Sequence, residues 1–356
     1  MNKSIRSLLF VGLGVIVAAG LLLVSCSKPA PTPAPGASPA AKPPAPAAKA
    51  IKMRLASGLV ATHGTSKVVQ WFADEVGKRS EGKLVIETYH GGQLFTHEQV
   101  IDAVKSNSVE LALSPGGHWN VLTPLMEFPN IFFLTDSEKT FLGSRDTIRE
   151  VMTQVDAENG IKFLYCIPYG EVGMVNSKRP VNTIDDMKGL KLRGVSKGAF
   201  DSIEILGAVP YDFPTPEVYD AVAKGAIDGV ASGTETITAR KWYETTKYAI
   251  LPFNISTWQV FVNMQAYNSL SKDIQDIMVQ VAKEAEDKQI EARRAYDEVN
   301  RKLLAEKQTT KVLTAEESKV WAAKLKPVHD NWVKSAAAKG HGALAQKLFD
   351  AFAKAR

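Results

Sequence analysis

The sequence predicts an α/β fold of two lobes, with a cleft between the lobes and a long helix that spans both. Three observations support this prediction. Segments typical of strands alternate with segments typical of helices after residue 50, one such unit recurs 118 residues further along, and residues 272–307 contain neither glycine nor proline. The 306 residues that follow Ala50 are also too many for one ordinary core.

The first lobe is expected to open with alternating strands and helices. The expected strands cover 52–56, 83–89 and 109–113, and the expected helices cover 67–78 and 97–106. This alternation is typical of βαβ units, so the sheet should be largely parallel. In open sheets of this kind, ligands bind outside the carboxyl ends of the strands.

One supersecondary unit is expected to occur once in each lobe. The segment 102–110 recurs as 220–228, with Asn107 and Gly225 in the same slot. Both residue types tolerate the left-handed conformation that ends a helix, and a strand should follow in each copy. Two such units that face each other would place the cleft between the lobes. Chance similarity between two helix–turn–strand segments is the alternative.

The second lobe has clear start and stop signals. The expected elements are a turn with a short helix (181–188), a strand (190–193), a helix (197–206) and a β-rich run that returns to the first lobe (255–263). Thr215 is a suitable N-cap and Pro216 a suitable first helical residue. The expected boundaries are 51–170 plus about 260–285 for lobe I, 171–259 for lobe II, and 271–356 for the long helix and C-terminal helices that pack on both lobes.

The N-terminus is typical of an exported lipoprotein. A positive start and an apolar run precede Cys26, so residues 1–25 are predicted to be a signal peptide and Cys26 the lipidated residue, on the periplasmic side of the envelope. An uncleaved membrane anchor is the alternative. Residues 26–50, rich in proline and alanine, should form an extended tether.

The composition argues against several functions. Loss of Lys3 and Arg6 with the signal peptide lowers the net charge from +5 to +3, which does not favour nucleic acid as a partner. Cys166 lies in an apolar run and is expected to be a buried thiol. The chain carries no HExxH, GxSxG, phosphate-binding glycine motif or zinc-spaced Cys/His cluster, so no enzyme activity or cofactor is predicted.

The order of several motifs resembles a known family. These motifs include Asn176–Val181, Asp186–Arg193, Leu206–Pro210 and Ile227–Gly229, and the similarity extends from about Ile51 to Leu304. Together they resemble the DctP-type extracytoplasmic solute receptors of TRAP transporters. The resemblance implies a two-lobed periplasmic-binding-protein-like fold, a small organic acid as ligand, delivery by hinge closure, and one small and one large membrane subunit as partners.

The resemblance also implies a ligand-binding role for Arg193. It ends the Lys-Gly-Leu-Lys-Leu-Arg strand, at the position where relatives pair an arginine with a substrate carboxylate. A guanidinium is always charged, and its fork matches a carboxylate. Ser232 occupies the slot of an asparagine that touches the carboxylate in relatives. A surface arginine in a solvated salt bridge is the alternative for Arg193.

One departure from the family pattern points to the ligand class. Many relatives carry a second arginine before the Asn-Ser-Lys-Arg-Pro motif, where this chain has Val172 beside Glu171. A second ligand carboxylate would then lack its partner, and an unpaired buried charge is costly. A monocarboxylate is therefore expected, with an amino or hydroxyl group facing Glu171. A solvated acid is the alternative for Glu171.

The remaining candidate wall residues rest on weaker signals. His63 follows the first strand, Ser114 is the repeat counterpart of Ser232, and Trp119 follows Ser114. Phe213 and Trp258 are candidates for an apolar face, although a tryptophan in a β run is more often core. Glu171 and Glu235 are conceivable oxygen ligands for a ligand-bridging metal ion, but no metal site is predicted. A binding protein of an ABC importer or a ligand-sensing partner of a sensor kinase is the alternative function.

Overall fold

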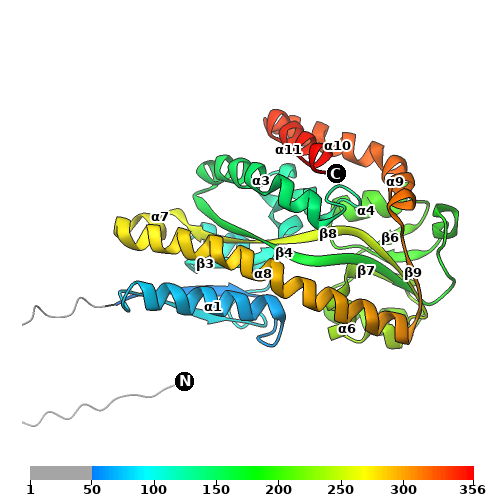
Figure 1. Ribbon diagram of the computed structural model, residues 1–356, viewed down its shortest axis with the longest axis horizontal. Helices are drawn as coiled ribbons and strands as arrows, with labels where there is room; N and C mark the ends of the chain where they lie inside the picture. Colours follow the sequence, from blue (N-terminus) through cyan, green and yellow to red (C-terminus); the bar gives the residue numbers. More distant parts are fainter. Residues whose placement is uncertain (1–49) are drawn as a thin grey trace, which may run out of the picture. The chain divides into compact units, whose positions relative to one another are not determined.

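The structure, a computed structural model, describes residues 50–356 (Figure 1). The predicted signal peptide, Cys26 and nearly all of the tether lie outside the described residues. Within the described part, one nine-stranded sheet has the order β2-β1-β3-β8-β4-β7-β5-β6, with β9 paired to β8. None of the helices described combines the length and hydropathy needed to cross a membrane.

The first part of the sheet is built from βαβ units, as predicted. It contains β1 (Ile51–Ser57), β2 (Leu84–Tyr89) and β3 (Leu111–Pro115), connected by α1 (Gly64–Arg79) and α2 (Gln99–Lys105). β1 runs parallel to both β2 and β3. Apolar residues of β1 and α1, including Leu55, Phe72 and Val76, are fully buried and hold the helix on the sheet.

The expected parallel pairing holds within the βαβ units, but two long antiparallel strands join the parts of the sheet, so the sheet as a whole is mixed. β4 (Ile161–Asn176) and β8 (Tyr248–Asn263) pair along nearly their whole length. Pro168 and Gly170 ordinarily interrupt strands. Here they lie where the β4–β8 register is irregular, between Pro168 and Gly170, so one strand continues through both.

The second part of the sheet repeats the topology of the first. It contains β5 (Lys191–Arg193), β6 (Val209–Tyr211) and β7 (Gly229–Gly233), with α4 (Lys197–Ile205) and α5 (Val218–Ala223) between them. β5 is parallel to β6 and β7, and β7 is antiparallel to β4, just as β3 is antiparallel to β8. α6 (Thr234–Ala239) follows β7, and β9 (Thr309–Val312) is parallel to β8.

The predicted internal repeat is confirmed. After the same 118 residues, both bounds of β3 recur in β7 and the last residue of α2 recurs in α5, which begins one residue later than the shift predicts. Asn107 and Gly225 both adopt left-handed backbone, with φ of 58° and 73°. The two units, β1-α1-β2-α2-β3 and β5-α4-β6-α5-β7, therefore share one fold, and we call them the first and second repeat.

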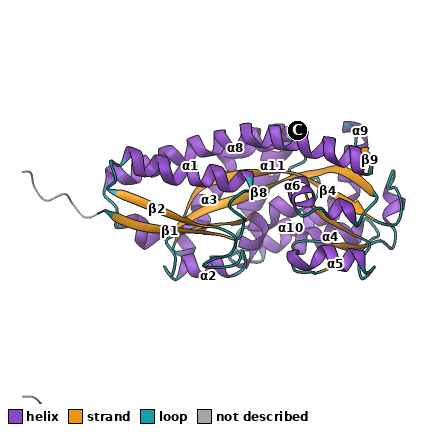
Figure 2. Ribbon diagram, turned by 90° about the horizontal axis from the view of Figure 1, so that it is seen from below, coloured by secondary structure: helices purple, strands orange, loops and turns teal. Residues whose placement is uncertain are grey.

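The long helix has the predicted bounds. α8 (Lys272–Lys307) is one uninterrupted helix of 36 residues. It packs on β4, on α1 of the first repeat, and on α6, which directly follows the second repeat. In Figure 2, α1 and α8 lie along one side of the strands, and α2, α4 and α5 lie along the other.

The remaining helices pack around this frame. α11 lies against α3, and α10 lies against α11 and α4. The other helices are α3 (Glu138–Asn159), α7 (Met264–Asn268), α9 (Ala315–Lys324), α10 (Lys326–Ala337) and α11 (Gly342–Ala355). Short 3-10 turns are η1 (Gly116–Val121), η2 (Pro124–Asn130), η3 (Ile184–Met187), η4 (Thr215–Glu217) and η5 (Trp242–Glu244).

Candidate functional site

A cavity of about 580 Å³ lies where the carboxyl ends of strands from both repeats meet. Residues just after β1 and β3 line one side, and the ends of β5 and β7 line the other. The predicted residues in its wall are His63, Arg193, Phe213, Ser232 and Trp258. This is the position at which open α/β sheets bind ligands.

Arg193 is the buried cation of the cavity wall. It is the last residue of β5 and is only 7% exposed. Its Nε donates to the Phe213 carbonyl oxygen at 3.1 Å, and its Nη2 donates to the Thr215 hydroxyl at 2.9 Å. Burial lowers the pKa of Arg193 to about 10, so the guanidinium stays charged at neutral pH.

Arg193 differs from most arginines of the protein in having no acidic partner. Eight of the eleven arginines described form an ion pair with a carboxylate. The other three are Arg179, Arg193 and Arg240, and two of these, Arg193 and Arg240, line the cavity. Asp212 and Glu98 attract the Arg193 guanidinium only from a longer distance. A buried guanidinium without a carboxylate in contact is costly, so the wall is arranged to receive an anion.

Stacked rings form a second wall. Tyr169 stacks on Trp258 at 4.9 Å and on His63 at 5.3 Å, measured between ring centroids. His63 Nδ1 accepts a hydrogen bond from the Thr65 N–H at 3.1 Å, which leaves the ring proton on Nε2, 3.2 Å from the Tyr169 hydroxyl. The imidazole is thereby fixed in one orientation and presents a flat surface against which a ligand can pack.

Three predicted wall residues, Ser114, Trp119 and Glu171, do not line the cavity. Ser114 is fully buried, and its hydroxyl donates to the His97 carbonyl oxygen at 3.0 Å. The Trp119 ring lies 4.1 Å from that of Phe261, and its Nε1 donates to the Ser114 carbonyl oxygen at 3.3 Å. Trp119 is therefore a core residue, and Ser114 supports His97, which does line the cavity.

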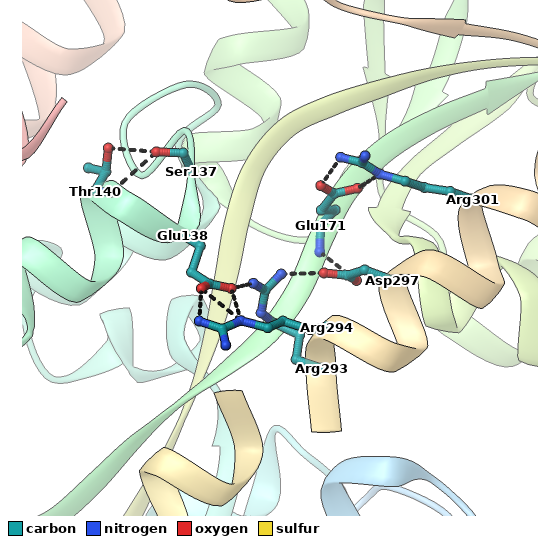
Figure 3. Close-up of polar contacts among 8 residues, drawn as sticks. All are labelled: Ser137, Glu138, Thr140, Glu171, Arg293, Arg294, Asp297 and Arg301. Carbon is teal, nitrogen blue, oxygen red and sulfur yellow. Dashed lines mark hydrogen bonds and ion pairs between the residues drawn. The ribbon is translucent and has the colours of Figure 1, made fainter. Parts of the chain in front are cut away.

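Glu171 lies away from the cavity, and the alternation of a strand explains why. Successive side chains on a strand point to opposite faces. Val172 lines the cavity, so Glu171 points toward α8, where Arg301 Nε binds its carboxylate at 2.6 Å (Figure 3). The expected ligand contact of Glu171 is corrected: its side chain is already paired with a cation.

Glu171 belongs to a larger ion network that joins β4, α8 and the start of α3. Asp297 Oδ1 lies 3.4 Å from the Glu171 N–H, and Asp297 also pairs with Arg293 (Figure 3). Arg293 also forms an ion pair with Glu138, the first residue of α3, and Glu138 forms a second ion pair with Arg294. Burial raises the pKa of Asp297 to about 6. The network holds the middle of β4 to the long helix.

Several wall residues were not predicted. Arg240, the C-cap of α6, is exposed, and Asp212 and Glu98 are exposed acids at the rim. No motif distinguishes them, because they reach the cavity only through the packing of distant elements. Thr215 was expected to cap a helix, but η4 has no side-chain cap and the Thr215 hydroxyl accepts from Arg193.

The structure adds no support for a metal site. Among residues 50–356, no group of three or more His, Cys, Asp or Glu side chains is placed to hold an ion. The two acids considered from the sequence have other partners: Glu171 pairs with Arg301, and Glu235 Oε1 accepts from the Gly64 N–H at 3.2 Å.

We expect acidification to destabilise the ligand-free protein partly through His63. Burial lowers its pKa to about 4 from an ordinary value of 6.5, so the unfolded chain binds more protons between these values and stability rises with pH. The His63→Gln variant should lose less stability between pH 7 and pH 5 than the wild type, by about 2 kcal/mol. Urea unfolding at both pH values measures this difference. An equal loss in both proteins would contradict the expectation.

The fold and the cavity define a two-lobed binding protein for a small solute, and comparison with known proteins identifies its family. Residues 56–335 match the DctP model, described as bacterial extracellular solute-binding protein, family 7. The chain belongs to this family. Because the family consists of substrate-binding receptors, the protein is an extracytoplasmic solute receptor and not an enzyme.

Individual relatives bind different organic acids. The chain is 26% identical over 223 residues to the 2,3-diketo-L-gulonate-binding periplasmic protein YiaO of Escherichia coli, covering 60% of this chain and 66% of that protein. It is 25% identical over 267 residues to the C4-dicarboxylate-binding protein DctP of Rhodobacter capsulatus, covering 73% and 79%. A sugar acid binding protein of Advenella mimigardefordensis, solved with galactonate, has a TM-score of 0.77 at 25% identity, covering 86% and 99%.

Proposed function

We propose that this protein is the solute receptor of a TRAP-type transporter and that its ligand is a small monocarboxylate. Arg193 holds the ligand carboxylate, the lobes close around it by a hinge motion, and the closed form delivers it to a small and a large membrane subunit. A lipid on Cys26 anchors the receptor on the periplasmic side of the envelope. The observation that carries the proposal is the buried Arg193 guanidinium, which lines the cavity with no carboxylate of the described residues within ion-pair distance.

The burial of the two cavity arginines favours one carboxylate over two. Arg193 is 7% exposed, whereas Arg240 is exposed at the rim. A charge pair that remains in water contributes little to affinity, and a desolvated pair contributes much more. A ligand with a second carboxylate deep in the cavity would find no second buried arginine or lysine there among the described wall residues. The ring stack of His63, Tyr169 and Trp258 suits an uncharged part of the ligand instead.

Two relatives support this ligand class. YiaO is named for 2,3-diketo-L-gulonate, and the Advenella protein was solved with galactonate. Both compounds carry a single carboxylate on a six-carbon chain. The Rhodobacter relative, named for C4-dicarboxylates, represents the competing class. The experiment must therefore compare the binding of ligands that have one or two carboxylates and are otherwise matched.

The middle of the β4–β8 pair is the proposed hinge. β4 has register irregularities between Pro168 and Gly170 and between Val172 and Met174. On one side of this segment β8 pairs with β3 of the first repeat, and on the other side β4 pairs with β7 of the second repeat. Regular hydrogen bonding is weakest at such irregularities, so bending there disturbs the fewest bonds. The predicted lobe boundaries at 170 and 259 lie close to this segment.

We expect the protein to prefer galactonate over matched compounds with no carboxylate or with two. Galactitol, galactonate and galactarate carry zero, one and two carboxylates on the same carbon chain, and 4-hydroxybutyrate with succinate forms a shorter pair. A ligand at 100 times its dissociation constant adds about 2.7 kcal/mol of stability, which a thermal unfolding screen detects. The monocarboxylate of at least one series should give the largest shift.

Other outcomes would contradict the proposal in distinct ways. An equal shift with galactitol would show that no carboxylate is recognised. A larger shift with galactarate or succinate than with the matched monocarboxylate would assign the protein to the dicarboxylate class. The monocarboxylate shift should also disappear in an Arg193→Gln variant.

A further inference from the structure

The guanidinium of Arg193 is held along one edge by a short loop. Nε and Nη2 form the side edge of the guanidinium fork, and both donate to the segment that follows β6. Nε binds the carbonyl oxygen of Phe213, and Nη2 binds the hydroxyl of Thr215. The side edge, which is one of the two edges that can bind a carboxylate with two hydrogen bonds, is therefore already used.

The remaining donors define how a ligand can bind. A guanidinium has five N–H donors: one on Nε and two on each Nη. The loop uses the Nε hydrogen and one Nη2 hydrogen, which leaves both Nη1 hydrogens and the second Nη2 hydrogen. One Nη1 and one Nη2 hydrogen together form the end edge of the fork, which matches the two oxygens of a carboxylate. No other hydrogen bond from Arg193 occurs within residues 50–356, so this edge is free for the ligand.

The loop is built to be stiff. Its sequence is Phe213-Pro214-Thr215-Pro216, and each proline fixes its own φ and restricts the residue before it. Pro214 has φ of −53° and precedes the 3-10 turn η4, which begins at Thr215. A free arginine side chain has many rotamers, and each one lost on binding costs affinity. A stiff acceptor loop removes that cost before the ligand arrives.

We propose that Thr215 is a positioning residue that orients Arg193, so that the ligand carboxylate binds end-on to Nη1 and Nη2. This inference rests on the proposed function, because it specifies how the same arginine engages the ligand. The Thr215 side chain does not cap η4, because its hydroxyl accepts a hydrogen bond from Arg193 and not from the backbone of the turn. The proposal gives this side chain a role in orienting Arg193 instead.

Two substitutions of Thr215 separate positioning from structure. Thr215→Val keeps the shape of the side chain and removes the acceptor, whereas Thr215→Ser keeps the acceptor. Because a hydrogen bond to a charged group is involved, galactonate affinity measured by calorimetry should fall about tenfold in the valine variant. It should stay within about threefold of the wild type in the serine variant. Equal weakening of both variants would overturn the proposal, because the hydroxyl acceptor would not be what matters.

A double variant tests whether the effect passes through Arg193. Arg193→Lys removes the fork but keeps the charge, so its affinity should fall strongly. Adding Thr215→Val to Arg193→Lys should change affinity little further, because no oriented fork remains to be lost. Independent, multiplicative losses in the double variant would overturn the proposal.

A ligand-free measurement keeps this proposal distinct from the proposed function. NMR of the guanidinium protons of Arg193 should show restricted rotation of Nη2 in the wild type and in Thr215→Ser, and faster rotation in Thr215→Val. Unchanged rotation in the valine variant would contradict the positioning role, whatever the ligand is. If galactonate binds none of the proteins while the rotation differs as expected, the ligand class is at fault and the positioning of Arg193 stands.

Discussion

Replacing Arg193 by glutamine should weaken binding of the monocarboxylate at least 30-fold, and by up to several thousandfold, while leaving the empty protein folded. Removing one partner of a buried charge pair costs about 2 to 5 kcal/mol, which corresponds to this range of dissociation constants. The cost is high because the ligand carboxylate would lack a counterion once the proposed closure of the lobes excludes water. Calorimetric titration with galactonate measures the loss.

The same substitution should not destabilise the ligand-free protein. Arg193 is buried with no carboxylate in direct contact, and desolvation is the largest electrostatic effect on it, so its removal relieves an unfavourable desolvation. The unfolding temperature without ligand should therefore stay the same or rise. Arg179→Gln is the matched control: Arg179 also binds two oxygen atoms that belong to no carboxylate, the carbonyls of Asp186 and Lys188, but it does not line the cavity. Equal loss of affinity in both variants would contradict the role of Arg193.

Gly170→Ala should destabilise the protein by about 2 to 4 kcal/mol. Gly170 has φ of 134°, a backbone conformation that residues with a side chain rarely adopt. A Cβ atom there would also lie 3.0 Å from Asp297 Oδ1, in the ion network that ties β4 to α8. Either β4 or Asp297 must move, and both lie at the proposed hinge. Urea unfolding gives the change in stability, and galactonate titration shows whether closure suffers as well.

Gly160→Ala provides the control for backbone strain alone. Gly160 has φ of 67° at the C-terminal cap of α3, and a Cβ atom there would meet no atom within 4 Å. Its substitution should cost about 1 kcal/mol, because the left-handed helical region is only moderately unfavourable for alanine. If Gly170→Ala costs no more than Gly160→Ala, the contact with Asp297 does not constrain β4.

Local signals were sufficient to predict much of the fold. The 36 residues of α8 contain no glycine or proline, and its predicted bounds agree with the structure. The repeated helix–turn–strand unit was visible because Asn107 and Gly225 occupy the same left-handed position. The long strand β4 was missed because Pro168 and Gly170 ordinarily end a strand, and only its pairing with β8 carries it past them.

The sequence predicted the site residues that lie at or just after the carboxyl ends of strands. Arg193, Ser232 and His63 follow or end strands whose carboxyl ends meet at the cavity. Ser114 does not line the cavity although Ser232 does, because Ser114 is covered by His97 from the segment before α2. Residues far apart in sequence decide such details. Arg301, which holds Glu171 away from the cavity, lies 130 residues further along the chain.

The two repeats share one topology but present unlike surfaces to the cavity, and this difference gives the binding site a direction. The second repeat contributes the buried guanidinium of Arg193, while the segments after β1 and β3 of the first repeat contribute His63 and other groups without a permanent charge, and Glu98 of the first repeat is exposed at the rim. A ligand with one charged end can satisfy both surfaces in only one of its two orientations. Every bound ligand would thus have the same orientation, and the membrane subunits would receive the ligand in that one orientation.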